Sequence, residues 1–183
     1  RLARGPEGRM GMLSSYDRSG GNDDFRNFER IEADGTYVLA DLKGPGCLRR
    51  LWFTSIPDDQ PLRFTFDDDS APRLTLTPAQ LKAGSVFPFL APLCDSPSGA
   101  TFSYVPLPFA RRLLITSPAR KDGKFFYQIN YELFPRGRHV VSPDWPLSPA
   151  ASNAVGRTRD RWLALSQDAL GTLDAEPTTV PAG

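Results

Sequence analysis

Hydrophobic and polar positions alternate with a period of two through most of the chain between residues 36 and 134. The segment 124–134 is the clearest example. Its two faces hold Phe125, Tyr127, Ile129, Tyr131 and Leu133 on one side and Phe126, Gln128, Asn130, Glu132 and Phe134 on the other. Because successive side chains of a strand point to opposite faces, this period predicts a β-strand. The same pattern predicts strands over residues 36–42, 47–56, 61–67, 73–77, 101–105 and 111–117.

Turns rich in glycine and proline separate these strands, and no helical segment lies between successive ones. This order excludes an α/β fold and predicts an all-β fold, an antiparallel jelly-roll sandwich with a C-terminal amphipathic helix. Gly44-Pro45-Gly46 is expected to form either a hairpin-like turn or a switch between sheets. The acidic run 67–69 favours a solvated hairpin turn, with a calcium site as the alternative.

The remaining segments set the expected domain organisation. Residues 1–35 form an N-terminal arm and polar loop, 36–134 the jelly-roll domain, 135–151 a Pro-rich linker, 152–171 the helix and 172–183 a tail. Within the sandwich, residues 78–81 are expected to form a helical turn, and 84–98 to cover one end of the fold. The C-terminal helix should begin at Ser152 or Asn153, end before Gly171, and carry an apolar stripe. That stripe holds Val155, Trp162, Leu165 and Ala169.

Charge and composition narrow the function classes. The 22 Lys and Arg nearly balance the 21 Asp and Glu, and no run of five like charges occurs, which argues against nucleic acid as a partner. No apolar run reaches the roughly 20 residues of a membrane span, so no membrane is expected either. The first eight residues lack a signal peptide's apolar core and an initiator Met, so we expect the numbering to begin inside a longer product. Localisation stays open, with a periplasmic or secreted location favoured over a cytoplasmic one.

Several kinds of catalytic site are excluded by residue type. His139 is the only histidine, which argues against a Ser-His-Asp or Cys-His hydrolase. Two remote cysteines, Cys47 and Cys94, give no zinc-ligand spacing and are expected to be free thiols. No metal and no cofactor is therefore predicted. Carboxylates remain, and sugar chemistry is the reaction class that uses carboxylate pairs alone. Glu132 is expected to point outward from its strand or to bond across it.

The densest group of polar side chains lies in the segment 14–25, which we name the opening loop. Adjacent glycines there allow positive φ, so the loop can present many hydrogen-bonding groups to a polar ligand; a simple Asx-type turn is the alternative. The candidate binding residues are Tyr16, Asp17, Arg18, Asn22, Asp23 and Asp24. Four aromatic side chains near loops could stack on sugar rings, namely Tyr16, Trp52, Tyr104 and Trp145, although a core position is favoured for Trp52.

Five ordered stretches carry a resemblance to a known family. They are Ser14–Asp24, Gly44–Trp52, Leu62–Asp67, Tyr104–Phe109 and Phe126–Tyr131. Together they resemble the motifs of glycoside hydrolase family 172, formerly domain of unknown function 2961, which includes difructose-anhydride and arabinofuranoside-processing enzymes. The resemblance spans Arg4 to about Phe134.

The resemblance implies a jelly-roll architecture, usually with two such domains per chain, and cyclic oligomers. It also implies retaining hydrolysis or transfer of furanosides by two glutamates that lie beyond residue 183. The expected partners are a carbohydrate substrate and copies of the chain itself, a homo-oligomer that is a trimer or a multiple of one. This chain would then supply pocket or interface residues from the opening loop, and its catalytic residues stay unknown. The alternative is a non-catalytic carbohydrate-binding or assembly module.

Overall fold

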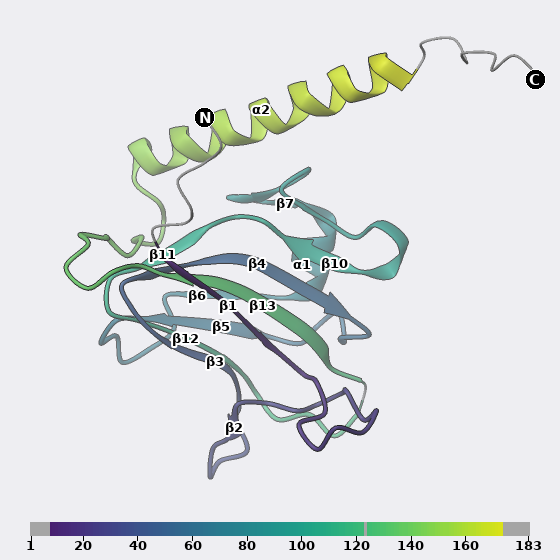
Figure 1. Ribbon diagram of the computed structural model, residues 1–183, viewed down its shortest axis with the longest axis vertical. Coiled ribbons are helices and arrows are strands. Elements are labelled where there is room, and N and C mark those ends of the chain that lie inside the picture. The colour runs from purple at the N-terminus through teal and green to yellow at the C-terminus, as the bar shows by residue number, and fades with distance from the viewer. Residues whose placement is uncertain (1–7, 123, 174–183) are drawn as a thin grey trace, which may run out of the picture.

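The fold is a β-sandwich followed by one long helix (Figure 1), seen in a computed structural model that describes residues 8–122 and 124–173. Every strand pairing in it is antiparallel. The first sheet has the order β1 (Arg9–Ser14), β13 (Phe126–Leu133), β4 (Gly46–Thr54), β10 (Thr101–Ser103) and β9 (Cys94–Asp95), with β11 (Leu107–Phe109) also paired to β4. The second has the order β2 (Arg30–Ile31), β3 (Tyr37–Lys43), β12 (Arg112–Ser117), β5 (Leu62–Phe66) and β6 (Leu74–Leu76).

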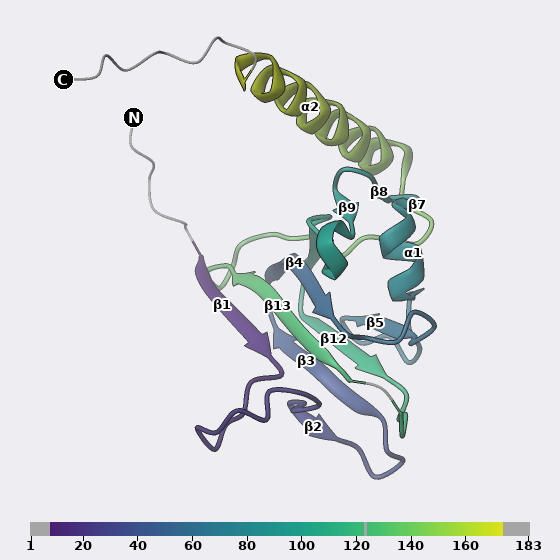
Figure 2. The same cartoon turned by 90° about the vertical axis from the view of Figure 1, so that its right-hand side faces the viewer.

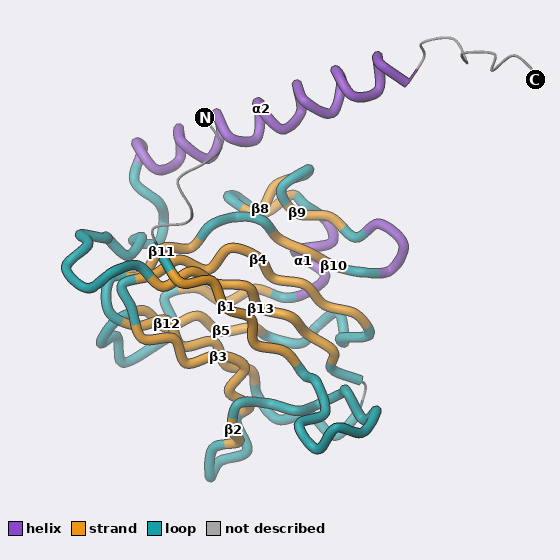
Figure 3. The backbone as a smooth tube through the Cα atoms, in the orientation of Figure 1, coloured by secondary structure: helices purple, strands orange, loops and turns teal. Residues whose placement is uncertain are grey.

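The two sheets lie as stacked layers, which the tube drawing makes easiest to follow (Figure 3). Their inward side chains form one core, and β5 shows why the sequence folds this way. Leu62, Phe64 and Phe66 are fully buried, whereas Arg63 and Thr65 face outward and are half-buried. Burying each large apolar side chain contributes about 1.5–3 kcal/mol. The predicted alternation is therefore confirmed: each sheet of the sandwich buries one face of its strands in the core.

Gly44-Pro45-Gly46 is a switch between sheets and not a hairpin, because β3 belongs to the second sheet and β4 to the first. Close packing explains the glycines. A Cβ added at Gly46 would lie 2.5 Å from the Phe109 ring, and one at Gly44 would lie 2.7 Å from it. By contrast, β5 and β6 form the hairpin expected around the acidic run.

One strand was missed by the sequence pattern. β1 pairs along its whole length with β13, although it falls in the segment expected to be an arm. Its outward residues Met10 and Met12 are 53% and 54% exposed. Because these solvent-facing side chains are apolar, the strand lacks the alternation of apolar and polar residues that marks a half-buried strand. Only Leu13 packs against the core from this strand. The sandwich thus begins well before residue 36.

The segment between β6 and β10 covers one end of the sandwich, as expected. It contains α1 (Pro78–Ala83), the two-stranded pair β7 (Ser85–Val86) and β8 (Phe89–Leu90), and the short 3-10 helix η1 (Pro97–Gly99). Thr77 and Gln80 form a reciprocal capping box at the start of α1, and Gly84 ends it in the left-handed conformation. Leu81 of α1 is fully buried. Both cysteines are free and buried, and burial raises the pKa of each thiol to about 11.

The C-terminal helix α2 (Pro149–Leu173) lies beyond the end of the sandwich that α1 covers (Figures 1 and 2). It begins three residues before the predicted cap, because the Ser148 hydroxyl accepts a hydrogen bond from the Ala151 amide and Pro149 suits the first helical position. It also continues past Gly171. In the described part of the chain, no helix is both long and apolar enough to cross a membrane.

Few side chains of α2 contact the sandwich. Val155 packs against the core, and the Trp162 ring lies 5.5 Å from that of Tyr104. Leu165 is exposed, and the side chain of Ala169 is outside the described ones. The predicted stripe therefore holds the helix to the sandwich only at its first two members.

Candidate functional site

The opening loop follows β1 and lies at the opposite end of the sandwich from α2 (Figures 1 and 2). It is anchored to the last strand. Ser15 donates its amide to the Tyr127 carbonyl at 3.1 Å, and its hydroxyl accepts the Tyr127 amide at 3.2 Å. The Tyr127 hydroxyl in turn donates to the Asn27 carbonyl at 3.0 Å, and burial raises the pKa of this phenol. The loop thus stands on a rigid strand.

Asp17 holds the loop together from inside. One carboxylate oxygen accepts the Ser19 hydroxyl at 2.6 Å and the Ser19 amide at 2.9 Å, and the other accepts the Asp23 amide at 3.2 Å. The Ser19 hydroxyl and then these amides lower the pKa of Asp17, because they favour its charged form. Gly21 is required nearby, since a Cβ there would lie 2.5 Å from the Asp17 carboxylate.

Two further residues of the predicted set are also engaged within the loop. Asp24 accepts the Asp17 amide at 2.8 Å, and Arg18 donates to Glu29 at 2.8 Å while lying over the Tyr16 ring at 4.9 Å. Asp17, Arg18 and Asp24 therefore fix the shape of the loop, which fits the alternative of an Asx-type turn as well as a binding role.

The other three predicted binding residues of the opening loop, Tyr16, Asn22 and Asp23, face solvent. Tyr16 is 55% exposed, and Asn22 and Asp23 are exposed as well. Among residues 8–122 and 124–173, neither the Asn22 amide nor the Asp23 carboxylate has a hydrogen-bond partner. A ligand at the loop would meet these three side chains on a surface already held in place.

The outer face of the first sheet continues from this loop. Directly opposed residues of antiparallel strands share a face, so register shows which side chains stand together. One row runs Phe102, Trp52, Gln128 and Ser14 across β10, β4, β13 and β1. The next row holds Arg50 and Asn130 beside Met12. In both views neither helix crosses these strands (Figures 1 and 2).

Aromatic rings extend this outer face at both ends. Toward α2, Phe102 lies 5.3 Å from Tyr104, which is 40% exposed. Toward the opening loop, the Phe126 ring lies 6.1 Å from that of Phe25. The expectation that Trp52 is a core residue is wrong: its neighbours Leu51 and Phe53 point inward, so alternation turns the half-buried indole outward.

Polar groups with spare hydrogen-bonding capacity lie between these rings. In the described part of the molecule, the Gln128 amide has no partner, and the Asn130 amide accepts only from Arg50, at 3.5 Å. The Arg50 guanidinium lies 5.7 Å from the Trp52 ring, and its Nε is buried without a partner there. The aromatic side chains can stack on the apolar face of a ligand ring, and the adjacent amides and guanidinium can hydrogen-bond its hydroxyl groups. This surface therefore suits a polar, ring-shaped ligand.

Glu132 has a structural partner. It is 8% exposed and accepts two bonds from Arg49 of the neighbouring strand β4, with Nε at 3.0 Å and Nη2 also in contact. The expectation that it bonds across its strand is therefore confirmed. The register passes from Asn130 opposite Arg50 to Tyr131 opposite Leu48, so the bulge lies in β4 and Arg49 is its extra residue. Glu132 keeps its outward position opposite Met10, where Arg49 and the backbone at Gly8 cover it.

The acidic run behaves as a turn. Asp67 has φ +53° and accepts the Arg111 amide at 2.7 Å, and Asp69 pairs with Arg73 at 2.8 Å. In the part of the chain that the structure describes, no group of three or more Asp, Glu, His or Cys side chains is placed to hold a metal ion.

Comparison with known families now decides the relationship. The model of the first β-sandwich domain of glycoside hydrolase family 172 matches residues 6–146. The chain belongs to glycoside hydrolase family 172. The match covers every strand and ends before α2 begins. A search of curated proteins found no match.

In the family 172 sandwich four of the five resembling stretches belong to or adjoin the first sheet, whereas Leu62–Asp67 contains β5 of the second sheet. Three of them contribute outward residues to the same region: Trp52 from the second, Tyr104 from the fourth, and Gln128 with Asn130 from the fifth. The first stretch is the opening loop itself. The sequence pattern identifies the loop residues and the stacking candidates Trp52 and Tyr104, but not Gln128 and Asn130. The period of two in residues 124–134 places these two on one face, which is the signal that could have found them.

Proposed function

We propose that the chain is the N-terminal sandwich of a furanoside-acting glycoside hydrolase or transglycosylase, and that its catalytic glutamates lie outside residues 1–183. Membership of family 172 carries the proposal. The state of Glu132 supports it, because a nearly buried carboxylate already held by Arg49 is poorly placed to attack a sugar or to protonate a leaving group.

The saccharide contact is assigned to the opening loop and the outer face of the first sheet. Tyr16, Asn22 and Asp23 would meet hydroxyl groups at the loop, while Trp52 and Tyr104 would stack on sugar rings. Asp17, Arg18 and Asp24 would act by holding the loop in shape. The unpartnered amide of Gln128 supports this arrangement, since a ligand hydroxyl could satisfy it without displacing a bond within the protein.

Catalysis is tested with the full-length gene product and the 183-residue chain, each assayed on a panel of aryl furanosides. The longer protein should turn over at least one substrate, and the chain should turn over none. Turnover by the chain would refute the assignment of the catalytic pair to a region outside it. Saccharide binding without turnover by the full-length protein would instead favour the non-catalytic binding or assembly module.

The contact surface is tested by Trp52→Ala in the full-length protein, with Phe87→Ala as the matched control. Phe87 is an exposed aromatic residue of the segment between α1 and β8, away from the outer face. Loss of one stacking ring should raise KM about tenfold, equivalent to about 1.4 kcal/mol, and leave the oligomer unchanged. Equal KM values in the two variants would remove the outer face from the substrate site.

Assembly into a homo-oligomer, a trimer or a multiple of one, is proposed as the second role of this side of the molecule. The exposed Met10 and Met12 on β1 support it, because methionine and aromatic side chains are enriched in protein interfaces. Light scattering of the full-length protein and of its Met10→Gln/Met12→Gln variant tests the idea. A monomeric wild type, or an unchanged oligomer in the variant, would contradict it.

A further inference from the structure

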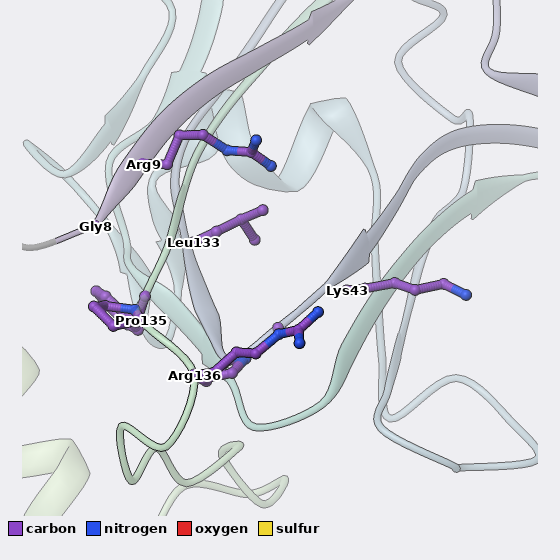
Figure 4. A pocket seen from close by; sticks show the side chains of 9 residues that line it. Gly8, Arg9, Lys43, Leu133, Pro135 and Arg136 are labelled. Carbon is purple, nitrogen blue, oxygen red and sulfur yellow. The ribbon is translucent and has the colours of Figure 1, made fainter.

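A hollow of about 420 Å³ lies at the far end of β1 from the opening loop (Figure 4). Its volume falls within the usual range for small-molecule sites. Three separate segments form it: the start of β1, the turn after β3 and the chain after β13. The lining residues are Gly8, Arg9, Lys43, Gly44, Pro45, Leu133, Phe134, Pro135 and Arg136.

Each of these segments supplies one cation, Arg9, Lys43 or Arg136. In the close view Leu133 lies between the two guanidinium groups, and the Lys43 side chain extends away from both (Figure 4). All three side chains are exposed, and within residues 8–122 and 124–173 none has an ion-pair partner. Among the described residues, the lining contains no carboxylate. The hollow is therefore strongly positive in a protein whose formal net charge is only +1.

A neighbouring carboxylate does not neutralise this charge. Glu132 lies behind Gly8, where an added Cβ would be 2.8 Å from its Oε1. Its charge is already matched by Arg49, which contacts its other oxygen. Within the described residues, the three lining cations therefore have no carboxylate of their own.

Backbone pairing holds the three segments in fixed relation. Arg9 is directly opposite Leu133 in the β1–β13 register, and the Phe134 amide donates to the Pro45 carbonyl at 2.8 Å. The Gly44 amide donates to the Arg111 carbonyl at 2.7 Å. The backbone positions of the cations are thus set by the fold, so a ligand has only side chains to order.

We propose that this hollow is a binding site for a phosphate or carboxylate group carried by a small polar molecule. Guanidinium groups match both anions with paired N–H donors, and an ammonium adds a point charge. Arg9 and Arg136 would supply the paired donors, and Lys43, which extends away from both, would add positive charge at longer range. β1 separates this anion site from the opening loop by about 20 Å, six residues at about 3.3 Å each. It is therefore distinct from the saccharide contact proposed above.

Calorimetric titrations of the 183-residue chain test the anion site, with four probes: inorganic phosphate, ribose 5-phosphate, glucuronate and neutral ribose. We expect one anion per chain, no binding of ribose, and affinity that falls as salt increases. The relative affinities of ribose 5-phosphate and glucuronate show which anionic group the site prefers. Binding of ribose as strong as that of ribose 5-phosphate, or no binding of any anion, would overturn the proposal.

Arg9→Gln and Arg136→Gln should each weaken phosphate binding about tenfold, since each removes one charge-assisted contact. The matched control is Arg157→Gln/Arg161→Gln, which removes two exposed cations of α2. Equal weakening in this control would mean that phosphate responds only to total charge, which overturns the site. Circular dichroism of each variant checks the fold. The result is independent of furanoside turnover, so failure here leaves the proposed function standing.

Discussion

The contact between Arg49 and Glu132 can be used to separate a structural glutamate from a catalytic one. The Glu132 side chain is 11% exposed, and that of Arg49 is 42% exposed. Removing one partner of a fully buried pair costs about 3–5 kcal/mol because the other charge is left buried. Water reaches Arg49 here, so we discount the effect and expect Arg49→Met to lower the free energy of unfolding by about 1–2 kcal/mol.

Glu132→Gln should have a smaller effect. The amide keeps an oxygen that accepts from Arg49 but loses the charge, so we expect a loss of about 0.5–1 kcal/mol. Urea unfolding followed by circular dichroism measures both values on the 183-residue chain. Arg111→Met is the matched control, because its pair with Asp68 is exposed on both sides and should contribute almost nothing.

The same glutamate variant in the full-length protein tests the assignment of roles. If Glu132 only holds β13 against β4, Glu132→Gln should leave kcat on aryl furanosides nearly unchanged. A thousandfold loss of kcat, with unfolding and oligomeric state like those of the wild type, would refute the structural role. An unfolding free energy unchanged in Arg49→Met would show that the discount for solvent was too small.

Three further predictions concern the loop, the second sheet and the thiols. Gly21→Ala should displace the Asp17 carboxylate from its amide donors and speed hydrogen exchange in the opening loop, which NMR would detect; unchanged exchange would contradict the crowding seen there. Arg112 and Arg30 lower the pKa of Asp41 in the folded protein, so the stability lost in Asp41→Asn should be constant above about pH 5. It should begin to shrink below about pH 4, where the carboxyl of the unfolded chain is protonated before that of the folded one. Denaturant titrations across pH test this, and a gap as large at pH 2 as at pH 6 would be inconsistent with it. Cys47 and Cys94, buried and with a raised pKa, should react with a thiol reagent at pH 8 only after unfolding, and rapid labelling of the native protein would show that burial does not protect them.

Alternation predicted the strands that bury one face and show a polar face to solvent, as in β5 and most of β13. It failed where the outward face is itself apolar. β1 carries Met10 and Met12 outside, so it does not look like a half-buried strand. The bulge at Arg49 in β4 could not be predicted either, because it depends on pairing with β13, a strand about 80 positions away, as the Asn130 contact with Arg50 illustrates.

The sequence predicts which residue types the candidate site contains. It does not predict which of them bond within the loop and which face solvent. The sequence indicates that 14–25 is rich in hydrogen-bonding groups, yet it does not say which of them are used internally. Asp17 and Asp24 bond backbone amides of their own loop, whereas Asp23, of the same residue type, is left facing solvent. Only the folded path of the loop makes that distinction.

The anchoring of the opening loop on the last strand has a consequence for synthesis. Ser15 and the Tyr127 amide it accepts are 112 positions apart. A ribosome adding about 5–20 residues per second needs about 6–22 seconds to cover that distance. During this interval the loop has left the ribosome without its support, so it takes its final shape only when the sandwich closes. A nascent chain arrested before β13 would therefore carry every residue of the loop without the strand that anchors it.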